Sequence, residues 1–231
     1  PRRHPAVDLL ARNGIIVALV LVVVVFAVLR PTTFLTVGNI GSILQANSSI
    51  ALMALGLMIP LIAGNFDLSV ATVAAFSGIL ATGLMAKQGV PWGAAILIAI
   101  AAAAVVGVVN GYLVAVIKLN SLVVTLASQS VLYGMILLYT QGAVVYDGIP
   151  TEFTTLGQGR PFGIPIPFLV VLLAALLLWF LLYYRPMGRR LYAIGGSADA
   201  ARLMGIKVDR TVLLSFVAAS VLAAIGGCLQ M

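Results

Sequence analysis

The uncharged stretch WGAAILIAIAAAAVVGVVNGYLVAVI, residues 92–117, decides the fold class of this chain. Lys118 ends the stretch, and no Asp, Glu, Lys or Arg interrupts it. A helix crosses the hydrocarbon core of a bilayer with about 20 mostly apolar residues. The stretch is therefore long enough to span a membrane as a single helix.

The composition of the whole chain supports the same conclusion. Its 231 residues are 62% hydrophobic and 8% charged, with a mean hydropathy of +1.18. Soluble domains are about 45–50% apolar and about 25% charged, because charge must cover their surface. We therefore predict an all-α integral membrane protein.

Seven apolar segments predict about seven transmembrane helices, at residues 14–29, 43–63, 68–86, 92–117, 122–139, 167–184 and from 212 onward. The first could instead be a signal peptide, because Arg2 and Arg3 precede it. No small-x-small cleavage site follows, so we favour a retained helix. The Gly- and Pro-rich residues 141–165 predict a loop in water.

The basic residues predict the orientation, because Lys and Arg are enriched in cytoplasmic loops. With a cytoplasmic N-terminus, only Arg30, Lys87 and Arg160 of the 13 Lys and Arg residues fall outside. The others fall inside: Arg2, Arg3, Arg12, Lys118, Arg185, Arg189, Arg190, Arg202, Lys207 and Arg210. These loops account for the net charge of +7, so we expect no nucleic-acid partner.

The sequence offers little material for catalysis or metal binding. Cys228 is the one cysteine and His4 the one histidine, so we expect no catalytic residue, metal site or cofactor on this chain. A G-x-x-x-x-G-K-[ST] phosphate loop does not occur either. Active transport would therefore need another subunit to supply the energy.

The polar sequence Gly64-Asn65-Phe66-Asp67-Leu68-Ser69 separates two apolar segments. An ionised Asp in mid-membrane costs about 2.5–3.5 kcal/mol on insertion scales. One interpretation is a tight turn in which Asp67 or Asn65 accepts from the free amides of the next helix. The other is a polar break on the permeation path, and the two are compatible.

Two further motifs stand out. Gly107 and Gly111 have the GxxxG spacing that lets helix backbones approach closely, which predicts tight helix packing. In residues 185–210, Ser197 can cap a short helix that starts at Asp199–Arg202, and Gly205 suits its left-handed end. We favour a cytoplasmic docking element there over an ordinary basic loop.

Three blocks of sequence resemble the permease subunits of bacterial ABC importers of the ribose/xylose type, in the branched-chain amino acid/sugar permease superfamily. They are AGNFDLSV at 63–70, NGYLV at 110–114 with VTL at 124–126, and residues 188–209. In the last block, Asp199-Ala200-Ala201 with Gly205 is similar to the E-A-A-x-x-x-G loop of importers, with Asp for Glu. Departures elsewhere are Ala63 for Thr, Asn65-Phe66 for Gly-Ile and Ala71 for Gly. The resemblance covers roughly residues 39–231.

The resemblance implies a single permease domain over residues 1–231, in a family with about ten helices, so we expect the last three or so to be missing. Residues 185–210 would be the cytoplasmic coupling loop, with Ser197, Asp199, Ala200, Ala201, Arg202 and Gly205 contacting an ABC ATPase subunit that binds ATP and Mg. An extracytoplasmic solute-binding protein, a second permease copy and membrane lipid would be the other partners. The expected location is the bacterial cytoplasmic (inner) membrane.

Selectivity in such a system would lie mainly in the binding protein, so the pathway would need only weak polar contacts. The candidates are Gln45, Asn47, Ser48, Asn65, Asp67, Ser69, Asn110, Thr125 and Ser128. Each could equally make an interhelical hydrogen bond, worth about 0.6 kcal/mol on average.

Rival functions remain open at this point. A branched-chain amino-acid permease or a nucleoside or signalling-molecule importer would have the same architecture. A stand-alone ion-coupled transporter should bury charged residues for coupling, and only Asp67 is a candidate. A membrane enzyme would need clustered catalytic groups.

Overall fold

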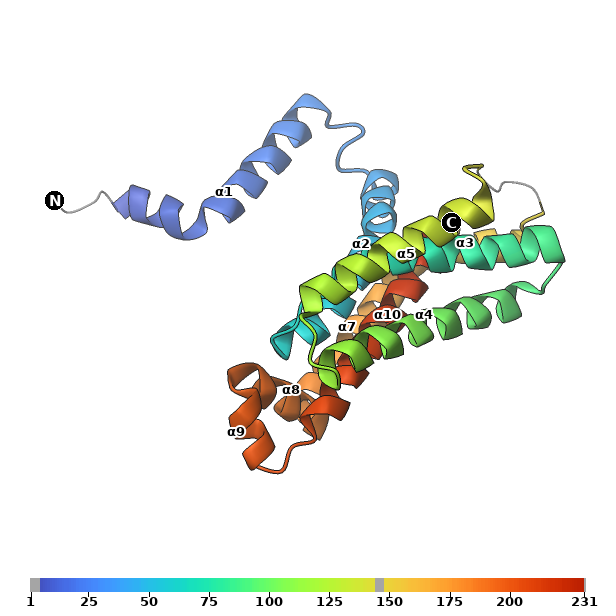
Figure 1. Cartoon of the computed structure of the whole chain (residues 1–231). Helices are drawn as coiled ribbons and strands as arrows, with labels where there is room; N and C mark the ends of the chain where they lie inside the picture. The colour runs from blue at the N-terminus through green and yellow to red at the C-terminus, as the bar shows by residue number, and fades with distance from the viewer. Residues whose placement is uncertain (1–4, 144–147, 231) are drawn as a thin grey trace. The chain divides into compact units, whose positions relative to one another are not determined.

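The computed structural model describes residues 5–143 and 148–230, and within these ranges its regular structure is helical (Figure 1). The chain divides into two compact units, residues 1–43 and residues 44–231, which we describe separately. The helices are α1 (Pro5–Leu29), α2 (Val37–Ile62), α3 (Val70–Gln88), α4 (Trp92–Ala115), α5 (Ser121–Thr140), α6 (Thr151–Gln158), η1 (Pro161–Gly163), α7 (Ile166–Tyr184), α8 (Pro186–Gly196), α9 (Ala198–Leu203) and α10 (Val208–Gln230).

Six of the described helices are long and apolar enough to cross a membrane, namely α2, α3, α4, α5, α7 and α10. In the first unit, α1 begins before the predicted residue 14, and its apolar part, Gly14–Leu29, is shorter than these six. That α1 also crosses the bilayer stays a prediction.

The core of the second unit forms where α10 packs against α3 and α4. Small residues allow this packing: Ala219, Ala223 and Ala224 of α10 are fully buried. At Gly227 a Cβ atom would lie 1.9 Å from the carbonyl oxygen of Ala74 in α3. Lipid tails are as apolar as the helices, so such close van der Waals contact drives helix association in membranes.

Two helices lie inside segments that we predicted to be loops. α6 occupies part of residues 141–165, where the side chain of Phe153, 2% exposed, packs with Met85, Ala95 and Cys228. α8 fills the first half of residues 185–210. Both are short and their apolar residues are few, so tertiary anchoring rather than a long hydrophobic pattern specifies them.

Most of the cations of the second unit lie at one end of its helices. This end, which we call the basic end, holds the α2–α3 loop, the α4–α5 turn, α8, α9 and the start of α10 (Figure 1). Residues of all five line one cavity. Its cations are Lys118, Arg185, Arg189, Arg190, Arg202, Lys207 and Arg210. Lys87 and Arg160 lie at the other end, where Lys87 donates to the carbonyl of Tyr139.

Candidate functional site

α8 is anchored on the end of α2. Leu191 and Ile194 of α8 are buried in the same cluster as Ile59 and Ala63. At Gly195 a Cβ atom would lie 2.0 Å from the carbonyl oxygen of Ile62. Because only a glycine permits this approach, the position of α8 against the end of α2 is closely defined.

α9 is a short capped helix that follows α8 directly. The Ser197 hydroxyl accepts from the amide of Ala200 at 3.3 Å. Gly205, at φ +79°, takes the left-handed conformation after the helix, and the amide of Ile206 donates to the carbonyl of Ala201 at 3.0 Å. Ala201 is buried, whereas Leu203 is 90% and Met204 82% exposed. α9 therefore presents an apolar tip outward at the basic end.

A network of ion pairs joins α9 to the start of α10 and to the α4–α5 turn. Asp209, in the first turn of α10, accepts from the Arg202 guanidinium at 3.2 Å and from the Lys118 ammonium. Arg202 also pairs with Asp199 at 3.5 Å. The side chains of Lys118, Arg202 and Asp209 are about half exposed. Exposed pairs contribute about 0–1 kcal/mol to stability, so this network positions the segment more than it stabilises the fold.

Asp67 lies in the α2–α3 loop and is buried, with 1% of its surface exposed. One oxygen of Asp67 accepts from both the amide and the hydroxyl of Ser69, the residue just before α3. Asp67 thus binds the residue before α3 rather than the amides of α3, and Asn65 donates to the carbonyl of Ala63. Burial raises the pKa of the Asp67 carboxyl, and the two hydrogen bonds from Ser69 only partly offset that rise.

The loop continues into a buried polar chain that links it to α4 and α5. The Ser69 hydroxyl accepts from the amide nitrogen of Asn110 at 3.1 Å, and the Asn110 amide oxygen accepts from the Ser128 hydroxyl. The Thr125 hydroxyl accepts from the amide of Leu68 at 3.1 Å. Four of the nine candidate pathway residues, Asp67, Ser69, Asn110 and Ser128, therefore form one hydrogen-bonded chain, and Thr125 bonds the same loop.

Gln45 lies at the opposite end of the second unit. Its amide nitrogen donates to the carbonyl of Gly157 at 2.9 Å, and its oxygen accepts from Arg160 at 2.8 Å. A cavity of about 320 Å³ beside it is lined in part by Ser49 and Gln230. Ser48 donates to the carbonyl of Leu44, within α2. Gln45, Asn47 and Ser48 thus lie together in α2, apart from the polar chain that begins at the α2–α3 loop, and Asn47 is exposed.

Gly107 and Gly111 both face α10. A Cβ atom at Gly107 would lie 2.7 Å from the Cα atom of Val217, and one at Gly111 would lie 2.9 Å from the Cα atom of Leu213. The backbones of α4 and α10 are therefore in direct contact at Gly107 and Gly111. Asn110 lies in the same turn of α4.

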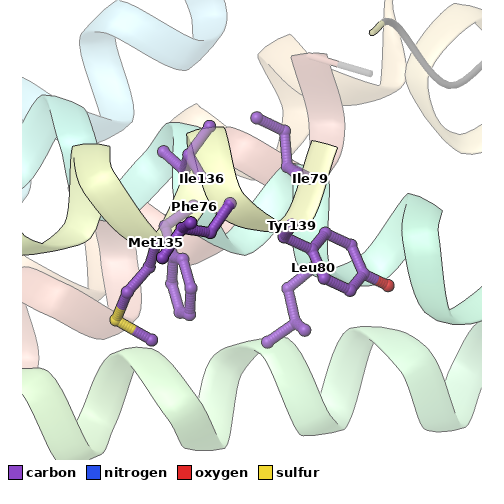
Figure 2. A pocket seen from close by; sticks show the side chains of 7 residues that line it. Phe76, Ile79, Leu80, Met135, Ile136 and Tyr139 are labelled. Atoms are coloured by element: carbon purple, nitrogen blue, oxygen red, sulfur yellow. The ribbon is translucent and has the colours of Figure 1, made fainter. Parts of the chain in front are cut away.

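An apolar pocket of about 420 Å³ opens between α3 and α5, away from both polar groups (Figure 2). Its lining comes from Phe76, Ile79 and Leu80 of α3 and Met135, Ile136, Leu138 and Tyr139 of α5. Apart from the Tyr139 hydroxyl, the side chains that line the pocket are hydrocarbon or thioether, which suits an acyl chain or another helix. Among the described residues, no three His, Cys, Asp or Glu side chains gather as they would around a metal ion.

Residues 39–231 match the family described as the permease component of the branched-chain amino acid transport system. This chain belongs to that family. The permease is also 30% identical to the ribose import permease of Escherichia coli (strain K12), over 99% of this chain and 72% of the relative. No solved structure matches this permease.

Two further relatives have comparable similarity to this permease. The ribose import permease of Bacillus subtilis (strain 168) is 34% identical over 94% of this chain and 67% of its own length. The D-allose transport system permease of Escherichia coli (strain K12) is 31% identical over 94% and 66%. The resemblance seen in the sequence is confirmed, and subunits of this family are non-catalytic membrane components of transporters.

Proposed function

We propose that this permease is the membrane subunit of an ATP-driven importer for a ribose- or xylose-like monosaccharide. The relatives named for ribose and allose support the choice of solute class. The observation that carries the proposal is α9, a capped helix with exposed Leu203 and Met204 at the basic end. We expect a soluble ATPase subunit to bind α9.

The orientation belongs to the same proposal. The basic end faces the cytoplasm, because it gathers Lys118 and the cations of residues 185–210, and only Lys87 and Arg160 of the second unit lie opposite. The N-terminus is then cytoplasmic, in the inner membrane of a bacterium. An extracytoplasmic solute-binding protein would deliver the sugar to the end that carries Gln45.

The mechanism follows from how α9 is attached. Residues 185–210 act as the coupling loop: an ATPase subunit, holding ATP and Mg, closes and moves α9. α7 and α10 flank the loop in the chain and transmit the motion to the helices. The sugar crosses between two permease copies, each a single transmembrane domain over residues 1–231.

Three of the polar candidates, Ser69, Asn110 and Thr125, are fully buried, which leaves them little contact with a passing solute. Asn110, Thr125 and Ser69 already hydrogen-bond within the protein, so they hold the helices while leaving selectivity to the binding protein. The family's description favours one second candidate, a branched-chain amino acid as the solute.

The Gly205→Val substitution tests the docking of the ATPase. Space is open around Gly205, but its φ of +79° strains any β-branched residue. We expect Gly205→Val to lower both ATPase binding to the complete permease and solute uptake. Gly196→Val is the matched control, since Gly196 has open space and no positive φ. Unaltered binding and uptake in Gly205→Val would remove α9 as the docking element.

A further inference from the structure

Lys118 has an unusual backbone in the turn between α4 and α5. Its φ is +68°, in the left-handed region that non-glycine residues seldom adopt. Its ammonium donates to the carbonyl of Ala115 at the end of α4 and to Asp209. We call residues 116–121 the elbow. Because its contacts keep Lys118 in a strained conformation, we infer that Lys118 positions the elbow.

On one side the elbow is attached to α9. Lys118 and Arg202 bind the same oxygen of Asp209, Lys118 from the elbow and Arg202 from α9. One carboxylate therefore connects the proposed docking helix to the elbow in two contacts. This connection is separate from the covalent path that runs from α9 through residues 204–207 into α10.

On its other side the elbow holds the α2–α3 loop. The Ser121 hydroxyl accepts from the amide of Phe66 at 3.2 Å, and Thr125, one turn later in α5, accepts from the amide of Leu68. Two amides of the loop therefore have their partners on side chains at the elbow and at the start of α5. The loop should therefore move together with the start of α5.

We propose that the elbow relays movement of α9 to the α2–α3 loop, and through Ser69 and Asn110 to the buried contacts of α4 and α5. Lys118 is the positioning residue of this relay. The inference rests on the proposed function, because it assumes that an ATPase moves α9. It adds a second route for the movement of α9, which reaches the α2–α3 loop in addition to α7 and α10.

The exposure of the network makes the proposal testable without unfolding the protein. Lys118 and Asp209 are about half exposed, so removing their charges should change stability little. A purely structural pair would then leave transport unchanged. A relay would lower the amount of solute moved for each ATP hydrolysed.

The experiment uses the complete permease with its ATPase and binding protein in liposomes. Solute uptake, ATP hydrolysis and ATPase binding are measured for Lys118→Met, Asp209→Asn and the double variant. We expect ATPase binding to persist and solute per ATP to fall by about fivefold or more in each single variant, a typical size for coupling between sites. The double variant should be little worse than either single variant, and Lys118→Arg should recover most of the loss.

Lys87→Met is the control, because Lys87 is an exposed lysine that also donates to a backbone carbonyl, yet it lies outside residues 185–210 and outside the Asp209 network. It should keep the solute per ATP of the unsubstituted protein. Normal solute per ATP in Lys118→Met and Asp209→Asn overturns the relay, as do fully additive losses in the double variant. An unsubstituted permease that binds no ATPase defeats the proposed function instead, so the two failures are distinguishable.

Discussion

Asn110 joins three parts of the protein at the scale of one side chain. It lies in α4, its amide nitrogen bonds Ser69 before α3, and its oxygen bonds Ser128 of α5. A side-chain amide carries its donor and its acceptor on separate atoms, so Asn110 can bond Ser69 and Ser128 at once, which an ionised carboxylate cannot do because it only accepts.

Ser128 and Ser130 give a matched test of that chain on one helix. The Ser128 hydroxyl bonds Asn110, whereas the exposed Ser130 hydroxyl bonds only the Leu126 carbonyl of its own helix. We expect Ser128→Ala to cost about 0.6–1.7 kcal/mol, which runs from the average to the largest value measured for hydrogen bonds between membrane helices. Thermal unfolding in detergent measures both variants, and Ser130→Ala should stay near the unsubstituted protein. Equal losses would mean that the interhelical bond contributes nothing.

Asp67 predicts a pH dependence of stability with a definite sign. Burial raises the pKa of its carboxyl above the usual 3.8, so the folded state holds the proton more tightly than the unfolded chain. The resulting stabilisation is fully present below pH 3.8 and is lost as the pH rises through the pKa of the folded state.

An Asn at position 67 keeps an oxygen for Ser69 and does not titrate. The melting temperature of Asp67→Asn, relative to the unsubstituted protein, should therefore rise between pH 4 and pH 8. Melting curves at both pH values in one detergent give the comparison. A difference that is constant or falls with pH would contradict the assigned shift.

At this scale, the sequence identified the unusual polar residues but not their partners. Asp67 and Asn110 stand out because they interrupt apolar segments. Asp67 bonds its near neighbour Ser69, but Asn110 bonds Ser69 from 41 positions away, and no local pattern encodes that second pairing. Lys118 drew attention only as a charge, because a left-handed backbone at a lysine leaves no signature in composition.

At the scale of elements, α4 offers two glycines with opposite surroundings. A Cβ atom at Gly107 would lie 2.7 Å from the backbone of α10, whereas nothing lies within 4 Å of one at Gly93. Gly107→Ala should therefore destabilise the protein by about 1–3 kcal/mol, the usual cost of overpacking. Gly93→Ala should be neutral or stabilise by up to about 1 kcal/mol. Melting temperatures in detergent compare the two, and equal effects would rule out the direct contact of α4 with α10.

The long helices were predictable from hydropathy because each carries about 20 apolar residues, and α4 begins at the predicted Trp92. α2 and α10 begin earlier than predicted, at Val37 and Val208, because their first turns carry polar residues such as Asn39 and Asp209. α6 and α8 were missed for a related reason: each is held by a few buried residues supplied by other helices.

At the scale of the whole molecule, the proposed orientation predicts which sites face which solution. Phe162 and Leu203 are both highly exposed, at opposite ends of the second unit. In a Cys228→Ala background, a membrane-impermeant thiol reagent added outside intact cells should label Phe162→Cys and not Leu203→Cys. Inverted membrane vesicles should give the reverse pattern. Labelling of both variants from the same side would overturn the topology and with it the ATPase contact.

Because α10 packs against both α3 and α4, the order of synthesis delays the formation of this core. α3 and α4 are synthesised roughly a hundred residues before it, which is about 5–20 s at ordinary rates of translation. Until α10 arrives, the glycine-lined groove of α4 at Gly107 and Gly111 has no partner. We therefore expect the newly made α3–α4 hairpin to lie in the bilayer without its main packing partner until α10 is inserted.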